Sequence, residues 1–202
     1  MLTARIAVLV SGGGTNLQAL IDAQAGGVLK NGQIALVIAD KAGIGAIERA
    51  EKAGIPCERI VRREPGFEEK VLSALEAHRI DMVVLAGFLG ILSADCIRRL
   101  GKPIINIHPA LIPSFCGKGF YGLRVHQAAL DYGVKVTGAT VHYVNEIPDG
   151  GEIILQKAVN VLPGDTPEVL QRRVMEQAEW VILPKAAEIV AAQIVREKES
   201  NE

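Results

Sequence analysis

The sequence has few of the residues that characterise disulfide-bonded, metal-binding or membrane proteins. Only three of its 202 residues are cysteine, and they lie far apart with no CxxC pair, which disfavours a disulfide framework and a zinc site. Aromatic residues make up only 4% of the chain, so its core must be built mainly from aliphatic side chains. The apolar run at residues 6–10 is far too short for a signal peptide or a membrane span.

The chain also lacks an excess of either charge. Its 22 basic and 23 acidic residues give a net charge of −1, with no basic stripe and no acidic tail. Neither nucleic acid nor a membrane is therefore an expected partner. Unpaired cysteines are typical of a reducing compartment, and this length suits one hydrophobic core. We therefore expect a single cytoplasmic domain that spans residues 1–202.

What the sequence does contain is a regular alternation of apolar runs and helical patterns. Strands are predicted at residues 5–11, 33–40, 81–87 and 104–107. Helices are predicted after Asn16 and at residues 44–53, 67–78 and 93–100. Strands that are apolar throughout and alternate with helices favour a parallel sheet covered on both faces. The fold prediction is a doubly wound, mostly parallel α/β sheet.

The second half of the chain has a different pattern. Residues 109–122 form a long irregular loop, of the kind that is usually functional or mobile. A helix is predicted at residues 123–132. Two strand-like runs, 137–144 and 152–161, then flank a turn and predict an antiparallel C-terminal extension of the sheet. The last helix is expected to begin at Pro167 and to bend or break at Pro184.

Residues 11–16, Ser-Gly-Gly-Gly-Thr-Asn, lie between the first strand and the first helix. Ligands of doubly wound sheets bind at the carboxyl ends of the strands, and exposed N–H groups at a helix start attract phosphate. A tight turn without a ligand is the plainer alternative. Asp40 would suit a dinucleotide site, but Leu17 stands where GxGxxG has its third glycine. The loop by itself predicts phosphate binding.

Asn106 and His108 end the strand at residues 104–107, and alternation places their side chains on the same side. A carboxamide beside an imidazole suits acyl transfer, since the amide stabilises an oxygen that gains charge and the imidazole transfers protons near neutral pH. The alternative is a polar pair with a structural role at a strand end.

Asp149 precedes two glycines, after a strand that carries Thr140 and His142. Such a turn can hold a carboxylate close to an imidazole, where the negative charge favours the imidazolium and raises its pKa. An ordinary Asp-Gly hairpin turn is the alternative. His126, Cys116 and the helix-end His78 have no neighbours that predict a catalytic or metal-binding role.

Five segments of the sequence together resemble the folate-dependent formyltransferases, with a Rossmann-like formyltransferase fold. They are residues 11–17, 85–93, 106–113, 138–143 and 149–151. Asn-x-His-Pro followed by a distant Asp is the specific part of this pattern, and Gly-Thr-Asn narrows it to the enzymes of purine synthesis and their deformylase relatives. The resemblance implies transfer of the formyl group of 10-formyltetrahydrofolate to the amine of glycinamide ribonucleotide, without a metal. A homodimer is compatible with it.

The resemblance also implies a role for individual residues. Asn106 would contact the formyl group, His108 would donate a proton, and Asp149 would tune His108. The residues implied to bind the phosphorylated substrate are Gly14, Thr15, Asn16 and Glu179. Those implied to bind the folate are Arg63, Leu89, Gly90, Ile91, Leu92, Asn106, Asn145, Glu146, Ile147, Pro148 and Asp149.

The chain departs from the family pattern at a few places. Gly90 stands where many members have arginine, Cys116 where proline is common, and Arg63 is one position out of register. One additional residue lies between Asp165 and Glu179.

Formyltetrahydrofolate deformylase is the nearest rival, but it resembles this chain plus an N-terminal domain. The formyltransferases of initiator tRNA add a C-terminal domain, and a nonenzymatic nucleotide-binding module would not need the Asn, His and Asp set.

Overall fold

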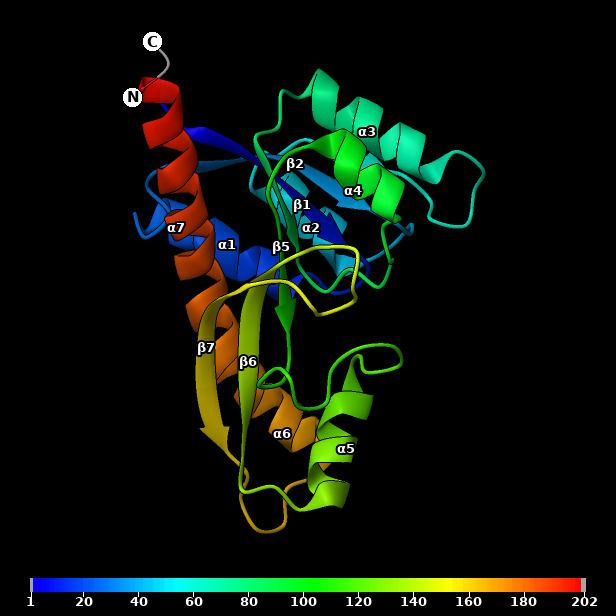
Figure 1. Cartoon of the computed structure of the whole chain (residues 1–202), viewed down its shortest axis with the longest axis vertical. Helices are drawn as coiled ribbons and strands as arrows, with labels where there is room; N and C mark the ends of the chain where they lie inside the picture. Colours follow the sequence, from blue (N-terminus) through cyan, green and yellow to red (C-terminus); the bar gives the residue numbers. More distant parts are fainter. Residues whose placement is uncertain (1, 201–202) are drawn as a thin grey trace.

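A computed structural model describes residues 2–200, which build one seven-stranded sheet (Figure 1). The strand order is β3-β2-β1-β4-β5-β6-β7. The first five strands are parallel, whereas β6 runs antiparallel to both β5 and β7. The predicted doubly wound sheet with an antiparallel C-terminal extension is therefore confirmed. The strands are β1 (Ala4–Val10), β2 (Gly32–Ala39), β3 (Cys57–Arg59), β4 (Met82–Leu85), β5 (Ile104–His108), β6 (Val136–Tyr143) and β7 (Ile153–Asn160).

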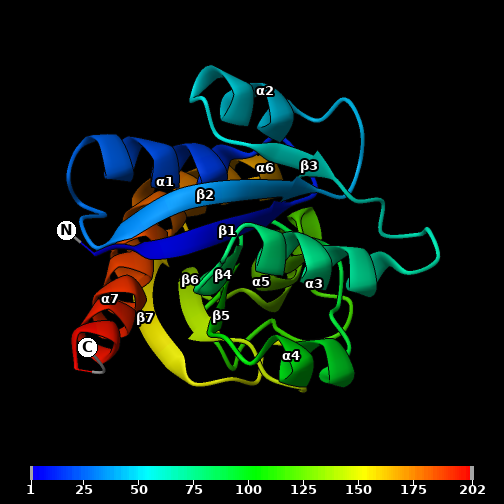
Figure 2. The same ribbon diagram turned by 90° about the horizontal axis from the view of Figure 1, so that it is seen from above.

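Helices cover both faces of the sheet, as Figure 2 shows for α1 and α2 above it and α3 and α4 below. In β1, Ile6 and Val8 belong to the apolar cluster beneath α1 and α7, while Ala7 and Leu9 belong to the one beneath α3. This explains why the strand is apolar at every position from Ile6 to Val10. The helices are α1 (Thr15–Ala25), α2 (Gly45–Lys52), α3 (Phe67–Ala77), α4 (Ala94–Leu100), α5 (Leu123–Tyr132), α6 (Pro167–Val174) and α7 (Trp180–Glu199).

The direction of winding reverses at β1. The chain moves outward from β1 through β2 to β3, then crosses back to place β4 on the other side of β1. The loops that follow β1 and β4 consequently meet at the carboxyl edge, where the amide of Leu89 donates a hydrogen bond to Ser11 Oγ (2.9 Å). Such a reversal is the usual ligand site of a doubly wound sheet.

Two features of the fold differ from the sequence prediction. The edge strand β3 was not predicted, because three residues are too few to show a period. The last helix was expected to bend or break at Pro184, and a break there is wrong, since α7 runs through this buried proline to Glu199. The interruption lies just before α7, in a π-helical turn at Met175–Glu179. A π-turn closes over one more residue than an α-turn, so this segment holds one residue more than an uninterrupted α-helix would need.

Within residues 2–200, no helix is both long and apolar enough to cross a membrane.

Candidate active site

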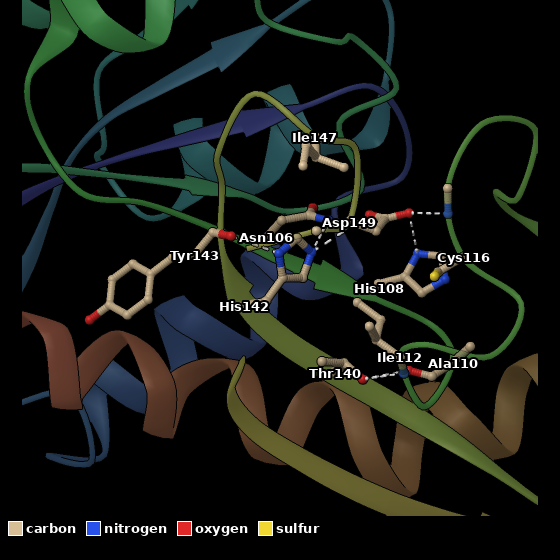
Figure 3. Close-up of polar contacts among 12 residues, drawn as sticks. Asn106, His108, Ala110, Ile112, Cys116, Thr140, His142, Tyr143, Ile147 and Asp149 are labelled. Atoms are coloured by element: carbon tan, nitrogen blue, oxygen red, sulfur yellow. Dashed lines mark hydrogen bonds and ion pairs between the residues drawn. The ribbon is translucent and has the colours of Figure 1, made fainter. Parts of the chain in front are cut away.

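The strand pair β5 and β6 brings the central polar side chains together (Figure 3). Asn106 lies directly opposite His142, and His108 directly opposite Thr140. Residues that pair across antiparallel strands share a face of the sheet, so these four side chains are neighbours. Thr140 has a structural role, since its hydroxyl donates to the carbonyl of Ala110 (2.7 Å) at the start of the following loop.

Asp149 reaches this group from the turn that connects β6 to β7. One carboxylate oxygen lies 3.6 Å from His108 Nδ1 and the other lies 3.6 Å from His142 Nε2. The turn folds back onto β6 only because residue 151 is glycine, as a Cβ there would collide with the carbonyl oxygen of Tyr143. The amide of Gly117 also donates to Asp149 Oδ2 (2.8 Å), which ties the loop after β5 to the turn.

The side chain of Asn106 is oriented by His142. The Nδ1–H of His142 donates to the carbonyl of Tyr143 (2.8 Å), so in the neutral ring Nε2 is an acceptor. The amide nitrogen of Asn106 lies 3.2 Å from that Nε2 and donates one of its two protons. The second N–H of Asn106 is then left for a ligand.

His108 is 4% exposed, and burial is the main influence on it. Burial lowers the pKa of His108 below its ordinary value, and the repulsion of His142 acts in the same direction. Asp149 and the carbonyl of Phe115, which accepts the Nε2–H (2.9 Å), raise it without reversing the shift. The sequence predicted that Asp149 raises the pKa of His108, and this is the direction of its effect here. The prediction left out burial, which lowers that pKa by more.

Asp149 itself is ionised at neutral pH. Burial opposes its charge, but the contacts with His142, the amide of Gly117 and His108 outweigh burial and hold the pKa of the carboxyl below its ordinary value. The cluster thus places a fixed negative charge between two imidazoles.

At the start of α1, Gly14 adopts a left-handed conformation (φ 74°), and a Cβ on it would lie 2.7 Å from Ala46. No side chain caps this helix, so the N–H groups of its first turn are available to an anion. Behind them, Asn16 Nδ2 donates to Glu179 Oε2 (2.7 Å), and both side chains are buried. Burial raises the pKa of Glu179, and the Asn16 bond opposes this only in part.

A sequence model of the formyl transferase family matches residues 4–186. The chain belongs to this family. It is 44% identical over 197 residues to trifunctional purine biosynthetic protein adenosine-3 of Bos taurus, covering 96% of this chain and 19% of that protein. It is 39% identical over 178 residues to chloroplastic phosphoribosylglycinamide formyltransferase of Arabidopsis thaliana, covering 86% of this chain and 61% of that protein. The chain thus spans about a fifth of the first relative and less than two thirds of the second.

Solved structures are similar along nearly their whole length. Glycinamide ribonucleotide transformylase 1 of Symbiobacterium toebii superposes with a TM-score of 0.87 at 39% identity, covering 95% of this chain and 89% of that one. Phosphoribosylglycinamide formyltransferase of Anaplasma phagocytophilum gives 0.86 at 38% identity, covering 95% and 88%. The predicted resemblance and the predicted transferase class are confirmed, and the deformylase alternative is not favoured.

In this formyl transferase the segment implied to bind the folate is partly open to solvent. Leu89 and Ile91 are 46% and 74% exposed, and Leu92 is buried. Gly90 lies so close to the ring of Phe88 that a Cβ would approach it to 2.5 Å. Apolar side chains exposed at the end of a sheet suit the flat ring of a ligand.

The turn after β6 also presents the residues that the resemblance assigns to the folate. Ile147 is 65% exposed, and its amide donates to Asn145 Oδ1 (2.9 Å). Glu146 pairs with Arg98 of α4 (2.9 Å), which holds the turn beside that helix, and Pro148 leads into Asp149.

Three placements could not be anticipated. The sequence marks His142 only as a strand residue. Its place in the site depends on the register of β6 against β5, which pairs it with Asn106. Arg63 is exposed, whereas the side chain of Arg62 packs beside Gly90, where its Cδ would lie 3.0 Å from a Cβ added to that glycine. Arg62 Nε lies 3.8 Å from Asp40 Oδ2. His126 is fully buried, and burial, with repulsion from His108, lowers its pKa to about 4.

Among residues 2–200 there is no group of three or more His, Cys, Asp or Glu side chains arranged to hold a metal ion.

Proposed function

We propose that this chain transfers the formyl group of 10-formyltetrahydrofolate to the amine of glycinamide ribonucleotide in purine synthesis. The observation that carries the proposal is the cluster of Asn106, His108 and Asp149 beside two loops suited to a phosphate and to a flat heterocycle. The names of its relatives support the same reaction. We further propose that residues 1–202 act as one unit, in the cytoplasm, with these two small molecules as partners. Formation of the formylated amide from the two substrates is the test.

The phosphorylated substrate would bind across the start of α1. Its phosphate would accept from the free N–H groups at Gly14, Thr15 and Asn16. Asn16 Oδ1 is buried without a hydrogen-bond partner, and the carboxyl of Glu179 lies beside the same side chain. These acceptors would receive hydroxyl or amine protons of the substrate, because a buried acceptor that stays unpaired is costly.

The folate would lie between residues 89–92 and 145–149. Gly90 and its neighbours leave backbone groups free for the polar edge of the pterin, and exposed Ile91 and Ile147 offer apolar contact to its faces. We propose that an arginine of the 62–63 pair contacts the folate as well. The position of Arg62 against Gly90 favours Arg62 over Arg63 for this contact.

The reaction would proceed by direct transfer. The substrate amine attacks the formyl carbon, and charge develops on the formyl oxygen. The free N–H of Asn106 and protonated His108 stabilise that oxygen. When the tetrahedral intermediate collapses, the bond from the formyl carbon to the folate nitrogen breaks, and that nitrogen takes the proton that the amine loses. Holding both reactants in one cleft supplies much of the acceleration.

His108 cannot donate to the substrate in the geometry seen here. Its Nδ1 faces Asp149 and its Nε2–H is donated to the carbonyl of Phe115. Phe115 has a positive φ of 50°, which is strained for a side chain of this size. We propose that the Phe115 carbonyl moves away when the substrates bind, which frees Nε2–H for the formyl oxygen while Asp149 stabilises the imidazolium.

Inorganic phosphate is expected to compete with glycinamide ribonucleotide and to leave folate binding nearly unchanged. The reason is that free phosphate would occupy only the N–H groups at the start of α1. Inhibition patterns measured against each substrate check this. Gly14→Ala should weaken the inhibition, whereas Gly164→Ala, which adds the same type of backbone strain in open space, should not. Phosphate that competes with the folate instead would show that the α1 assignment is wrong.

Asp149→Asn is expected to lower the pKa of His108 further. Removing the negative charge 3.6 Å from Nδ1 removes a contribution that favours the imidazolium, while burial still disfavours it. The fraction of protonated His108 at neutral pH should fall, and the decline of kcat with rising pH should begin at lower pH. NMR titration of the His108 ring measures the shift, with the exposed Asp131→Asn as control. An unchanged or raised pKa would contradict the proposed role of Asp149.

A further inference from the structure

Residues 87–92 connect β4 to α4 with little backbone support. All six lie in the described part of the chain, and Leu89 is the only one with a hydrogen bond there. The remaining support is apolar: the ring of Phe88 stacks on Phe67 with centroids 6.3 Å apart, and Leu92 is buried. Apolar contact is not directional, so the backbone path of the segment depends on what holds the amide of Leu89.

That amide donates to the hydroxyl of Ser11 (2.9 Å), at the end of β1. The same hydroxyl donates its single proton to Asp40 Oδ2 (2.9 Å). A serine hydroxyl whose proton is committed to a carboxylate has only lone pairs left, so it can only accept from Leu89. Ser11 is 5% exposed, which keeps water from replacing either partner.

Asp40, which accepts the Ser11 proton, is buried in a way that lowers the stability of the fold. It follows β2 and is 2% exposed, and its second oxygen, Oδ1, is buried with no hydrogen-bond partner. The nearest positive charge, Arg62 Nε, is 3.8 Å from Oδ2. A buried carboxylate with one unpaired oxygen destabilises a fold. What the arrangement does provide is a fixed direction for the Ser11 hydroxyl.

We propose that Ser11 and Asp40 are positioning residues for the folate. Asp40 orients the Ser11 hydroxyl, the hydroxyl holds the amide of Leu89, and Leu89 sets the backbone of the segment proposed to bind the pterin. Ser11 is also the first residue of the loop 11–16 that leads into α1, so one hydroxyl connects the two segments proposed to bind the substrates. This inference rests on the proposed function, because it assumes that residues 89–92 meet the folate.

The test compares Ser11→Ala, Asp40→Ala and Asp40→Asn with the unmodified chain. Ser11→Ala is expected to raise the KM for 10-formyltetrahydrofolate and the Kd for tetrahydrofolate about tenfold, the effect of roughly one hydrogen bond, with a much smaller change in kcat. Asp40→Ala should act in the same direction. Asp40→Asn should largely restore binding, since its carboxamide oxygen still accepts the Ser11 proton.

Two further measurements separate positioning from general destabilisation. The Leu89 amide should exchange with deuterium slowly in the unmodified chain and quickly in Ser11→Ala. Ser93→Ala is the matched control, because it removes the N-cap of α4 at the other end of the same segment. It should lower stability while changing folate binding less than Ser11→Ala does.

Three results would overturn the proposal: an unchanged Kd for tetrahydrofolate in Ser11→Ala, an equal rise in Ser93→Ala, or no recovery in Asp40→Asn. Failure of the folate assignment on which this inference rests looks different. In that case the unmodified chain would neither bind tetrahydrofolate nor consume the formyl donor, and both proposals would fall together. Binding by the unmodified chain that Ser11→Ala leaves intact would overturn the positioning role alone.

Discussion

His108→Ala and Asn106→Ala are each expected to lower kcat by roughly 10²-fold or more. Both side chains would act on charge that develops on the formyl oxygen only as the amine attacks. Removing either therefore raises the transition state more than the bound ground state, so KM should change much less than kcat. Asn106 is oriented before the substrates bind, because its Nδ2 lies 3.2 Å from His142 Nε2 and donates one proton to it. Asn106→Ala removes this oriented donor.

Steady-state rates at saturating substrates measure this effect, on variants whose thermal unfolding resembles that of the unmodified chain. His78→Ala and Asn160→Ala are suitable controls: His78 pairs with Glu58 away from the cluster, and Asn160 is exposed at the end of β7. Near wild-type kcat in His108→Ala or Asn106→Ala would remove that residue from the proposed mechanism. Unfolding of a variant by circular dichroism would instead point to a structural role.

The strands and helices of the sheet could be predicted because each one is marked by the residues within its own segment. A strand such as β1, buried on both faces, has to be apolar at consecutive positions, and each helix is marked by its own period and flanking glycine or proline. Asn106 and His108 could likewise be placed together, since two residues apart on one strand share a face. These inferences need no knowledge of which strands pair.

What the sequence did not show depends on contacts between distant segments. The place of His142 beside Asn106 comes from the register of β6 against β5, and the lowered pKa of His108 comes mainly from its burial in the folded chain. The π-turn at Met175–Glu179 was also not visible in the sequence, because a single π-helical turn within a helical run shows no apolar period of its own. Composition and period contain none of this information.

With 10-formyltetrahydrofolate alone, the chain is expected to release formate very slowly, and glycinamide ribonucleotide should accelerate loss of the formyl group by orders of magnitude. Asn106 and His108 can polarise the formyl group for any nucleophile, so the reaction depends on which nucleophile is held against it. The free N–H groups of α1 and the buried pair of Asn16 and Glu179 would hold a phosphorylated amine there. Proximity of this kind accounts for large accelerations.

Folate turnover can be followed by its absorbance while mass spectrometry identifies the product, which should be the formylated amide in equal amount. The matched control is the same compound without its phosphate, which should accelerate turnover far less, because it lacks the group that α1 would bind. A deformylase would have to position water in place of the amine. Fast formate release that the ribonucleotide leaves unchanged would therefore mean that water is the nucleophile, and the chain would then be a hydrolase built on the same Asn106, His108 and Asp149.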